Sequence, residues 1–492
     1  MSEPAASNQT EEGLQAVPLC VDLDQTLIRT DVLWETAVQL WRKPIVALKA
    51  IVALMWHGKA AFKAELATAF PLDPATLPYR DDVLAYINAQ REAGCVLVLA
   101  TATHHLVAQR IADHLGVFSR VIATEYNSNL SGNRKREALV AAFGRRGFDY
   151  IGDHRKDLPI FASARQAMLV EPSPGLLRKA SGIANVTRVF AVPRSLAGIL
   201  ARALRLHQWA KNALLAVPLL AAHQGSNLQA WANVLEAFLA FGLVASATYL
   251  INDLVDLPSD RRHARKRFRP LASGQLTIPC GILLTGALAL AGFALSVVLL
   301  SADFMVYLVT YVVLTLGYSF DLKRRLLVDV LALAVLYTLR ILAGGIAIGV
   351  VVSEWLLMLS LFIFLSLAFL KRYIELRDSS GTAKVSGRGY SSIDLETIRI
   401  VGVSSGLISV LVLSLYISNP AVSTLYQAPQ MLWFMCPLLI YWIARIWFLA
   451  ARGQVHHDPV VFALLDFRSY VVGALGAAIV FLATVGVGGI RW

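Results

Sequence analysis

The 492-residue sequence contains little cysteine and little charge for its length. Its cysteines are scattered and form no CxxC pair; they are Cys20, Cys95, Cys280 and Cys436. This pattern excludes a disulfide framework and a cysteine-based zinc site, and it predicts a reduced chain that faces the cytosol. Charged residues make up only 16% of the chain, whereas 57% of the residues are hydrophobic. Soluble domains carry a smaller apolar share, so part of the chain is expected to lie in a membrane.

Lysine and arginine are missing from four short segments between the apolar runs of the second half: residues 224–230, 300–303, 350–354 and 419–428. The alternate segments are rich in these residues: 253–276, 323–325 and 371–388. Because basic loops remain on the cytosolic side, the alternation predicts a multi-pass protein of the inner (cytoplasmic) membrane. The soluble part and the active sites would be cytosolic and the C-terminus outside. Anionic lipid and anionic substrates explain the net charge of +12 better than nucleic acid does.

The apolar runs divide the chain into a soluble part and a membrane part. Each run is roughly long enough to cross a bilayer. They lie near 207–223, 231–252, 277–299, 304–320, 327–350, 355–373, 398–418, 429–449 and 470–489. We therefore expect a multidomain chain with an α/β, Rossmann-like domain and an all-α membrane bundle of about nine transmembrane helices. The predicted parts are a disordered lead-in at 1–15, the α/β domain at 16–190, a linker at 191–204 and the bundle at 205–492.

Short apolar runs in the soluble part end in polar residues. They read VPLCVDLD, CVLVLATAT and FDYIGD, which is typical of buried parallel strands. The carboxyl ends of such strands meet at one sheet edge, where α/β proteins form their sites. Residues 32–77 form a helical insertion rich in Trp and Leu, which we expect to be a packed cap. Alternatively, its stretch WRKPIVALKAIVALMWHGK could lie on the membrane surface.

Chemically distinctive residues follow these strand ends in a fixed order. They are Asp22 and Asp24 in DLDQT, Thr101 in CVLVLAT, Lys135 in GNRKREAL, and Asp153 and Asp157 after FDYI. This ordered set resembles the haloacid dehalogenase-like phosphatases over about residues 16–185. That family usually has glycine where Gln25 stands, and we expect this departure to affect the turn more than the chemistry.

The resemblance implies hydrolysis through an aspartyl-phosphate. Asp22 would attack phosphorus, and Asp24 would protonate the leaving group and then activate water. Thr101 and Lys135 would hold the transferring phosphoryl group. A bound Mg²⁺ would neutralise the crowded charge. The candidate Mg²⁺ ligands are Asp22, Asp24, Asp153 and Asp157.

Residues 252–270, NDLVDLPSDRRHARKRFRP, place acidic residues beside a dense basic run at the edge of an apolar segment. Hydrophobic segments exclude carboxylates unless they are needed. The spacing suits Mg²⁺ held together with substrate phosphates, and the basic run suits the phosphates themselves. The candidate metal and pyrophosphate ligands are Asn252, Asp253, Asp256 and Asp260, of which Asp253 and Asp256 are the candidate catalytic residues. The candidate donor-phosphate ligands are Arg262, Lys266 and Arg267.

This block, together with LHQWAKN at 206–212, resembles the first aspartate-rich motif of the UbiA superfamily of intramembrane prenyltransferases over about residues 200–490. Most members that condense prenyl diphosphates carry a second, DxxxD-type motif. The corresponding segment here, LKRYIELRD at 370–378, has several cations, and Glu375 remains a candidate metal ligand. YSFDLKR at 318–324, TLRILAGG at 338–345, Trp355 and the run Arg388-Gly389-Tyr390 resemble the decaprenyl-phosphate phosphoribosyltransferase branch.

Resemblance to this branch implies transfer of 5-phosphoribose from phosphoribosyl pyrophosphate to a polyprenyl phosphate. The soluble domain would then remove the 5-phosphate, giving a lipid-linked ribose for cell-envelope glycans. Further candidate phosphate ligands are Lys211, Tyr318, Lys323, Arg324, Arg340, Lys371 and Arg372. Lys211 could instead only snorkel at a span end, and Arg340 could pair with helix backbone or a carboxylate. The sequence leaves the oligomeric state open.

Two other functions remain open. A prenyltransferase that uses a prenyl diphosphate and an aromatic or lipid acceptor, with a separate phosphatase, predicts a second acidic pair and an apolar pocket. A transport or binding protein with a regulatory phosphatase-like domain predicts charges along a path through the bilayer. Apart from Arg340 and Glu354, charge gathers mostly on one face, which favours an enzyme.

Overall fold

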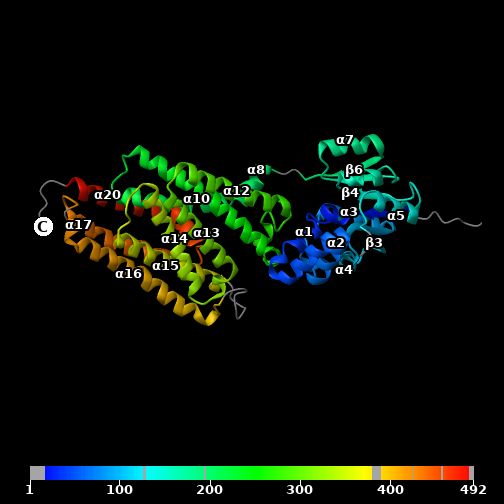
Figure 1. Ribbon diagram of the computed structural model, residues 1–492. Helices are drawn as coiled ribbons and strands as arrows, with labels where there is room; N and C mark the ends of the chain where they lie inside the picture. Colours follow the sequence, from blue (N-terminus) through cyan, green and yellow to red (C-terminus); the bar gives the residue numbers. More distant parts are fainter. Residues whose placement is uncertain are drawn as a thin grey trace, which may run out of the picture. The chain divides into compact units, whose positions relative to one another are not determined.

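The computed structural model describes residues 17–125, 129–192, 195–378, 389–423, 425–455 and 458–486. The chain forms two compact units (Figure 1). The first contains residues 1–203 and 253–282, and the second contains residues 204–252 and 283–492. The predicted lead-in at 1–15 lies outside the described residues, and so does Arg388, which belongs to the run that resembles the phosphoribosyltransferase branch.

A six-stranded parallel sheet forms the centre of the first unit, in the order β3-β2-β1-β4-β5-β6. The strands are β1 (Leu19–Val21), β2 (Leu97–His104), β3 (Arg120–Thr124), β4 (Asp149–Gly152), β5 (Ala167–Val170) and β6 (Val186–Phe190). The three strands predicted from the sequence are β1, β2 and β4, which are neighbours in the sheet. Their carboxyl ends therefore meet at one edge, as predicted.

Helices cover both faces of this sheet. They are α3 (Asp81–Glu92), α4 (His105–Leu115), α5 (Asn133–Phe143), η4 (Arg155–Asp157), α6 (Leu158–Phe161) and α7 (Pro174–Ile183). Successive side chains of a strand point to opposite faces. Leu19 and Val21 accordingly pack in one hydrophobic cluster, whereas Cys20 between them packs in the other. Burial on both faces explains why these strands are continuous apolar runs.

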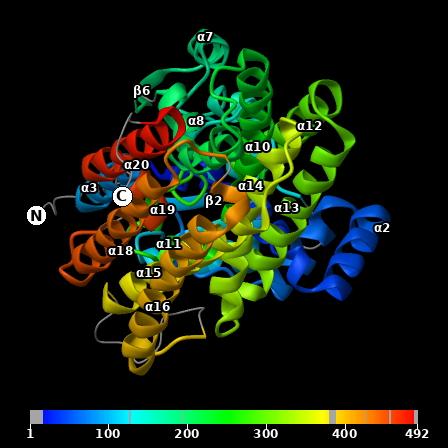
Figure 2. The ribbon, with the colours of Figure 1, turned by 90° about the vertical axis from the view of Figure 1, so that its left-hand side faces the viewer.

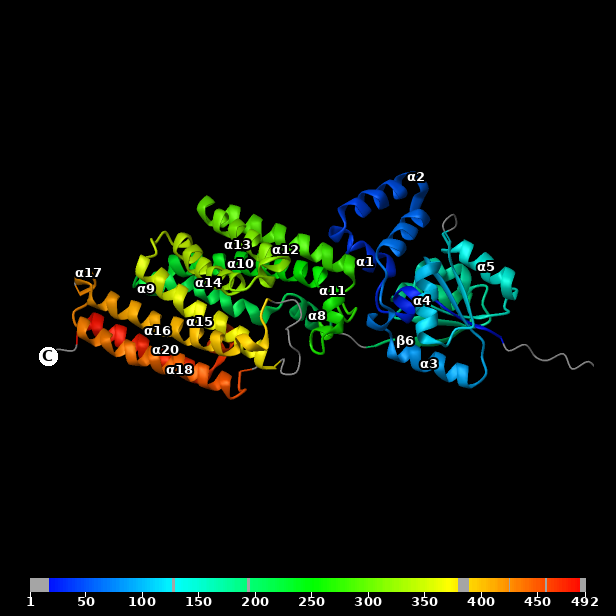
Figure 3. The same cartoon turned by 90° about the horizontal axis from the view of Figure 1, so that it is seen from below.

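A helical cap follows the first strand, as the sequence predicted. It comprises α1 (Val32–Ala37), η2 (Leu40–Arg42), α2 (Pro44–Ala69) and η3 (Pro74–Thr76). Helix α2 is interrupted at Gly58, whose φ of 79° and ψ of −169° are not helical. Glycine adopts this backbone conformation without the steric cost that a side chain brings. The helix therefore has two arms, which Figure 3 shows meeting at a bend.

The first unit also contains elements that adjoin the bundle helices in the sequence. These elements are α8 (Leu196–Ala203), α11 (Leu257–Arg262) and η6 (Lys266–Phe268). The segment 253–282 lies between two long apolar helices in the sequence, and it belongs to the compact unit that holds the sheet. Residues 253–282, which the sequence assigned to the membrane domain, therefore belong to the compact unit of the sheet. The predicted domain boundary near residue 205 stays a prediction.

The second unit is a bundle of long helices. They are α10 (Leu228–Val255), α12 (Ile278–Leu299), α13 (Ala302–Phe320), α14 (Val328–Ala347), α15 (Glu354–Asp378), α16 (Leu395–Ser418), α18 (Met435–Ala451) and α20 (Phe467–Val485). The last three residues of α10, 253–255, belong to the first unit. Shorter elements are η5 (Leu206–Ala216), α9 (Val217–Ala221), η7 (Leu322–Arg324), η8 (Ser392–Asp394), α17 (Pro420–Ser423), η9 (Pro429–Phe434) and α19 (Pro459–Leu465). Helices α15, α16 and α18 pack side by side, and α20 lies against α18 (Figure 2).

Nine helices among the described residues are long and apolar enough to cross a membrane. Eight coincide with predicted spans, so the predicted multi-pass bundle is confirmed. The predicted first span, 207–223, is wrong as a single helix: it forms η5 and then α9. Pro218 opens α9, because proline has no N–H to continue a preceding helix. The ninth candidate is Pro44–Ala69, which is α2 of the cap.

Candidate functional sites

A pocket of about 280 Å³ opens at the carboxyl edge of the sheet. Strand β1 ends just before Asp22, and β4 ends just before Asp153, so the two central strands deliver these carboxylates to one place. The other polar side chains that line the pocket are Asp24, Gln25, Asp31, Thr36, Lys59, Lys63, Thr103, His104, Asn129, Ser131, Lys135, His154, Lys156 and Asp157. Topology therefore assembles a charged pocket from segments far apart in the sequence.

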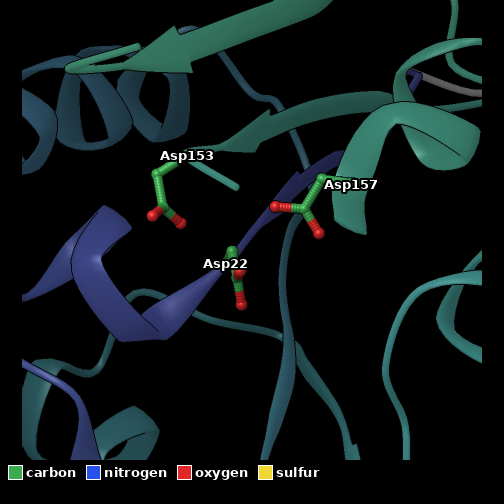
Figure 4. A group of neighbouring side chains, drawn as sticks. All are labelled: Asp22, Asp153 and Asp157. Carbon is green, nitrogen blue, oxygen red and sulfur yellow. The ribbon is translucent and has the colours of Figure 1, made fainter. Parts of the chain in front are cut away.

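Three carboxylates of the pocket converge, as Figure 4 shows. Asp22, Asp153 and Asp157 each offer one oxygen, and these oxygens lie within 4.8 Å of one another. Asp157 is fixed by the His154 N–H, which donates to its Oδ2 at 3.2 Å. Across the described ranges, no other group of three or more His, Cys, Asp or Glu side chains meets this criterion. An all-oxygen donor set of this kind fits a hard divalent cation such as Mg²⁺.

The charge balance of the pocket also favours a bound cation. Lys135 is 2% exposed, and its Nζ lies 2.9 Å from Asp22 Oδ1 and 4.0 Å from Asp157 Oδ1. Burial raises the pKa of Asp22 to about 6, although the Lys135 charge opposes this shift. Burial and the neighbouring carboxylates raise the pKa of Asp153 well above its ordinary value. One ammonium group thus faces three carboxylates, and a divalent cation would restore the balance.

Asp24 is placed differently from the three converging carboxylates. Its Oδ1 accepts the Val32 N–H at 2.8 Å, and its Oδ2 accepts the Thr103 hydroxyl at 2.7 Å. Burial, followed by the charge of Asp31, raises the pKa of Asp24 to about 7. A carboxyl group that titrates near neutrality is suited to donate and accept a proton. Asp24 lies outside the group that converges on a possible cation, so its predicted role as a metal ligand stays a prediction.

The turn η1 (Leu23–Leu27) positions Asp24, and Gln25 shapes that turn. Gln25 has a φ of 57° and a ψ of −2°, in the left-handed region that favours glycine. Its N–H donates to Thr30 O at 3.0 Å, which holds the turn closed. The departure from the family's glycine therefore falls on backbone conformation, while the Asp22 and Asp24 carboxylates still reach the pocket.

Sequence reasoning missed two pocket residues and placed a third differently. Thr101 is fully buried, and its hydroxyl accepts the Thr103 N–H at 3.0 Å, whereas the Thr103 side chain lines the pocket. Lys63 of α2 reaches the pocket and donates to Ala102 O at 2.6 Å. The threonine repeat in CVLVLATAT was a usable signal for Thr103. Nothing in the local sequence pairs Lys63 with a strand 39 residues later.

In the first unit, the aspartate-rich block is organised by Arg269. Its Nη1 lies 3.0 Å from Asp253 Oδ1 and 2.6 Å from Asp260 Oδ2. Both residues are buried: Asp253 is 4% exposed and Asp260 is 2% exposed. Asp256 stands at the start of α11, and Asn252 is in the last turn of α10. The basic run contained Arg269, but the sequence did not mark it as the residue that bridges two aspartates.

The other cations of this block have separate partners. Arg262 makes an exposed ion pair with Asp73 at 3.2 Å, and Lys266 Nζ lies 4.0 Å from Asp260 Oδ1. Arg267 lies over the Phe268 ring. Arg261, which the sequence did not single out, is buried and pairs with both oxygens of Glu35, at 2.6 and 2.8 Å. The structure therefore does not gather Arg262, Lys266 and Arg267 on one ligand.

In the second unit, Lys211 and Lys371 converge on one carboxylate. Each Nζ lies 2.9 Å from Asp458 Oδ2, although the two lysines come from η5 and α15. Burial alone would raise the pKa of Asp458, but the two ammonium groups outweigh it and lower that pKa below its usual range. The sequence predicted both lysines as phosphate ligands but missed Asp458. The only signal for Asp458 was a carboxylate between two apolar runs.

Arg372 lies at the centre of a second buried network. Its Nε is 2.6 Å from Asp329 Oδ2, its Nη2 donates to the Tyr318 hydroxyl at 2.8 Å, and its Nη1 pairs with Glu375. Tyr390 donates to the other oxygen of Asp329 at 2.6 Å. The predicted residues Tyr318, Arg372 and Glu375 are therefore together, but they bind one another. Asp329 and Tyr390 complete the network.

Arg340 pairs with groups of the bundle itself. Its Nη1 donates to Leu336 O at 2.7 Å, its Nε to Asn212 Oδ1 at 3.1 Å and its Nη2 to the Tyr311 hydroxyl at 3.2 Å. This is the helix-backbone pairing that the sequence left open as the alternative. The predicted ligands Lys323 and Arg324 lie in η7, directly after α13.

Comparisons with known proteins identify the family. A model of the UbiA prenyltransferase family matches residues 213–469, and one of the haloacid dehalogenase-like hydrolases matches residues 19–162. The protein y4nM of Sinorhizobium fredii is 36% identical, over 95% of this chain and 91% of its own. The chain belongs to the UbiA prenyltransferase family. It is an enzyme of the UbiA transferase type with an N-terminal haloacid dehalogenase-like domain.

Two other relatives cover a smaller share of this UbiA-family chain. Nodulation protein NoeC of Azorhizobium caulinodans is 34% identical over 57% of this chain and 92% of its own. The decaprenyl-phosphate phosphoribosyltransferase of Mycolicibacterium smegmatis is 32% identical over 59% of this chain and 95% of its own. The branch resemblance drawn from the sequence is therefore supported by a relative that bears that branch's name.

Proposed function

We propose that this protein is a bifunctional membrane enzyme that makes a lipid-linked ribose. Its UbiA part transfers 5-phosphoribose from phosphoribosyl pyrophosphate to a polyprenyl phosphate and releases pyrophosphate. Its soluble domain then removes the 5-phosphate, giving a donor for cell-envelope glycans. The active sites face the cytosol, where a soluble sugar phosphate reaches them. The observation that carries the transferase half is the convergence of Lys211 and Lys371 on Asp458.

Two ammonium groups on one carboxylate leave a surplus positive charge inside the bundle. Charge in such surroundings is costly unless it is compensated. A substrate phosphate supplies the missing negative charge and forms charge-assisted hydrogen bonds with the lysines. The acceptor in the proposed reaction is already a phosphate anion, so it needs positioning and a positive environment more than a base. We therefore assign Lys211 and Lys371 to a substrate phosphate.

The surroundings of Glu375 support phosphoribosyl transfer over prenyl transfer. Prenyl-diphosphate condensation predicts a second acidic pair, free for a second metal, near residues 370–378. Glu375 pairs with Arg372, which is itself held by Asp329. This acidic group is therefore engaged by a cation of the same segment, which weakens the case for a second metal–diphosphate clamp there.

The aspartate-rich block is assigned to the pyrophosphate of the donor. Asp253 and Asp260 are nearly buried carboxylates whose oxygens meet at Arg269, and oxygen donors of this kind fit Mg²⁺. Asn252 and Asp256 complete the proposed ligand set. When bound, the metal neutralises the leaving pyrophosphate. Arg269 holds the carboxylates in place and must release at least one of them to a metal ion.

The soluble pocket has the groups needed for phosphate removal. An Asp22 oxygen attacks the 5-phosphorus, and the bond between phosphorus and the C5 oxygen breaks. Asp24 gives its proton to that leaving oxygen, then takes a proton from the water that hydrolyses the aspartyl-phosphate. Lys135, 2.9 Å from Asp22, holds the phosphoryl oxygens. When bound by Asp22, Asp153 and Asp157, Mg²⁺ offsets the charge of the phosphate.

An assay with purified full-length protein tests the transferase half. The protein is given phosphoribosyl pyrophosphate labelled in the ribose, a polyprenyl phosphate and Mg²⁺, and in parallel a labelled prenyl diphosphate with an aromatic acceptor. We expect label to enter lipid only in the first reaction. The double variant Lys211→Met/Lys371→Met should lose this transfer. The control variant Glu396→Gln/Arg399→Gln, which removes an exposed ion pair, should retain the transfer activity. Label from the prenyl diphosphate alone would overturn the proposal.

A further inference from the structure

The first arm of α2, residues 44–57, presents an apolar surface that the first unit does not cover. Ile45, Leu48, Met55 and Trp56 are 65–78% exposed, whereas Ala50 and Ala53 are buried. Soluble proteins rarely leave so many large apolar side chains together in water. Such a surface needs an apolar partner.

The bend at Gly58 decides what kind of partner fits. The whole of α2 is long and apolar enough to cross a membrane by length and composition. Its second arm, however, buries Ala60, Ala61 and Ala64 and places Lys63 in the pocket, and α2 contacts β2 and α4 of the soluble domain. The first arm alone is roughly 21 Å long at 1.5 Å per residue, too short for a hydrocarbon core of about 30 Å. It can lie along a bilayer surface but cannot span one.

The charge around the arm matches an anionic bilayer. Residues 36–64 contain no Asp or Glu, and Arg42, Lys43 and Lys49 lie just before the arm and within it, whereas Lys59 and Lys63 line the pocket. Trp41 and Trp56, both exposed, stand near the two ends of the arm. Tryptophan near the ends, exposed apolar residues and neighbouring cations are typical of helices that lie in the membrane interface.

The arm also begins where a membrane span ends. Arg42 Nη2 donates to the carbonyl of Val255 at 3.0 Å, and Val255 is the last residue of α10. Helix α10 is one of the candidate spans. Pro44 starts the first arm two residues after Arg42. The beginning of the arm therefore contacts the residue at which this candidate span ends.

We propose that the first arm of α2 is an interfacial helix that holds the phosphatase pocket at the surface of the anionic bilayer. The two arms are joined at Gly58, so anchoring the first arm positions Lys63 and the pocket that it lines. The pocket thereby receives the phosphate of a substrate whose other end stays in the lipid. This substrate class rests on the proposed function, whereas the placement of the helix does not.

Lipid contact can be measured in the full-length protein. Met55→Cys is labelled with bimane in a background that lacks Cys95, Cys280 and Cys436, and it is reconstituted into vesicles of phosphatidylcholine and phosphatidylglycerol. Brominated lipid should quench this label about twofold. A label at Asn88→Cys, on an exposed turn of α3, is the matched control and should not respond. Equal quenching at the two positions would overturn the proposed placement, whatever the pocket hydrolyses.

The functional consequence is tested by comparing two phosphate esters. Met55→Glu/Trp56→Glu should hydrolyse the lipid-linked 5-phosphate in vesicles about tenfold more slowly, because charge opposes insertion of the helix. Hydrolysis of soluble ribose 5-phosphate should be unchanged, and Met55→Leu/Trp56→Phe should behave like the unmodified protein. An equal loss on both esters, or no loss on the lipid-linked one, contradicts the positioning role. If the unmodified protein ignores the lipid-linked ester, the proposed function fails, while the quenching result still decides the placement.

Discussion

Asp24 is the residue whose protonation should limit the phosphatase reaction. In the proposed reaction it acts first as a proton donor, and the donating form is present below its pKa, which burial raises to about 7. The Thr103 hydroxyl bonds to the carboxylate at 2.7 Å and lowers this pKa, since it stabilises the charged form. Both the position and the pKa of the proton donor thus depend on a residue of the neighbouring strand.

Replacing Thr103 with valine should move the alkaline limb of the pH profile. Loss of the hydrogen bond raises the pKa of Asp24 further, so the proton donor stays protonated to higher pH. We expect the alkaline limb of kcat/KM for ribose 5-phosphate hydrolysis to shift upward by roughly half to one pH unit. Thr103→Ser keeps the hydroxyl and should leave the limb in place. A limb that stays fixed in Thr103→Val, or moves to lower pH, contradicts this role for Asp24.

The sequence predicted which carboxylates lie together where a motif fixed their spacing, whereas their roles stay predictions. Asp22, Asp153 and Asp157 were predicted together because each follows a buried strand, and the parallel sheet brings such ends together. Thr103 and Lys63 were missed because their roles depend on a bulge in β2 and on the bend of α2. These are tertiary features: the threonine repeat in CVLVLATAT marks Thr103 as a candidate, but no local pattern shows which threonine lines the pocket or that Lys63 reaches it.

At the scale of elements, Asp458 holds three parts of the bundle together. It receives Lys211 from η5 and Lys371 from α15, and its Oδ1 accepts the Val460 N–H at the start of α19. The Asp458 and Lys211 side chains are 9% and 8% exposed, so Lys211 has little access to water when Asp458 is removed. Removing one partner of a buried ion pair leaves an uncompensated charge.

Asp458→Asn should therefore destabilise the bundle. We expect the free energy of unfolding to fall by roughly 3 kcal/mol, measured by thermal or denaturant unfolding in detergent. The effect should weaken as the pH falls, because the lowered pKa of Asp458 makes its contribution depend on the ionised form. Lys211→Met/Lys371→Met/Asp458→Leu should recover much of the loss, since apolar replacement of the whole cluster leaves no buried charge.

A matched control is the ion pair of Arg445 with Asp466 at 2.7 Å, whose side chains are 12% and 13% exposed. Asp466→Asn alters one pair and one helix cap, not a carboxylate shared by two lysines. It should cost about 1 kcal/mol. If Asp458→Asn is no worse than Asp466→Asn, the lysine cluster does not carry the charge that we assign to it.

Hydropathy predicted the elements of the bundle, but it could not tell an irregular segment from a helix. Eight of nine predicted spans are long helices. Residues 207–223 are apolar enough, yet Lys211 and Asn212 are buried in polar contacts and Pro218 starts a new helix. Conversely, α2 qualifies on length and composition although Gly58 bends it. Backbone breaks at single residues decide both differences.

At the scale of the molecule, these differences bear on topology. The basic loops predict a cytosolic soluble domain and an outside C-terminus, which requires that residues 207–223 cross the membrane as η5 and α9. A phosphatase or fluorescent reporter fused after Trp492 should therefore report an outside location. The same reporter fused in the basic segment after residue 324 should report the cytosol. With the soluble domain in the cytosol, a cytosolic C-terminus together with an outside location after residue 324 would mean that this irregular segment does not cross the membrane.

The two proposed catalytic sites in one chain favour successive steps on one lipid. The product of the proposed transfer would carry the 5-phosphate that the soluble pocket is suited to remove. The chain also packs the segment 253–282, with Asp253 and Asp260, in the same compact unit as the sheet. We therefore propose that 5-phosphoribose is first attached to the lipid and that the same protein then removes the 5-phosphate.

A double-label experiment tests this claim most directly. Phosphoribosyl pyrophosphate carrying ¹⁴C in the ribose and ³²P in the 5-phosphate is given to the full-length protein with polyprenyl phosphate and Mg²⁺. The unmodified protein should yield lipid that contains ¹⁴C but has lost ³²P, whereas Asp22→Asn should yield lipid that retains both in equal amounts. Lipid without ¹⁴C, or the same ratio of ³²P to ¹⁴C in the two proteins, would contradict the account.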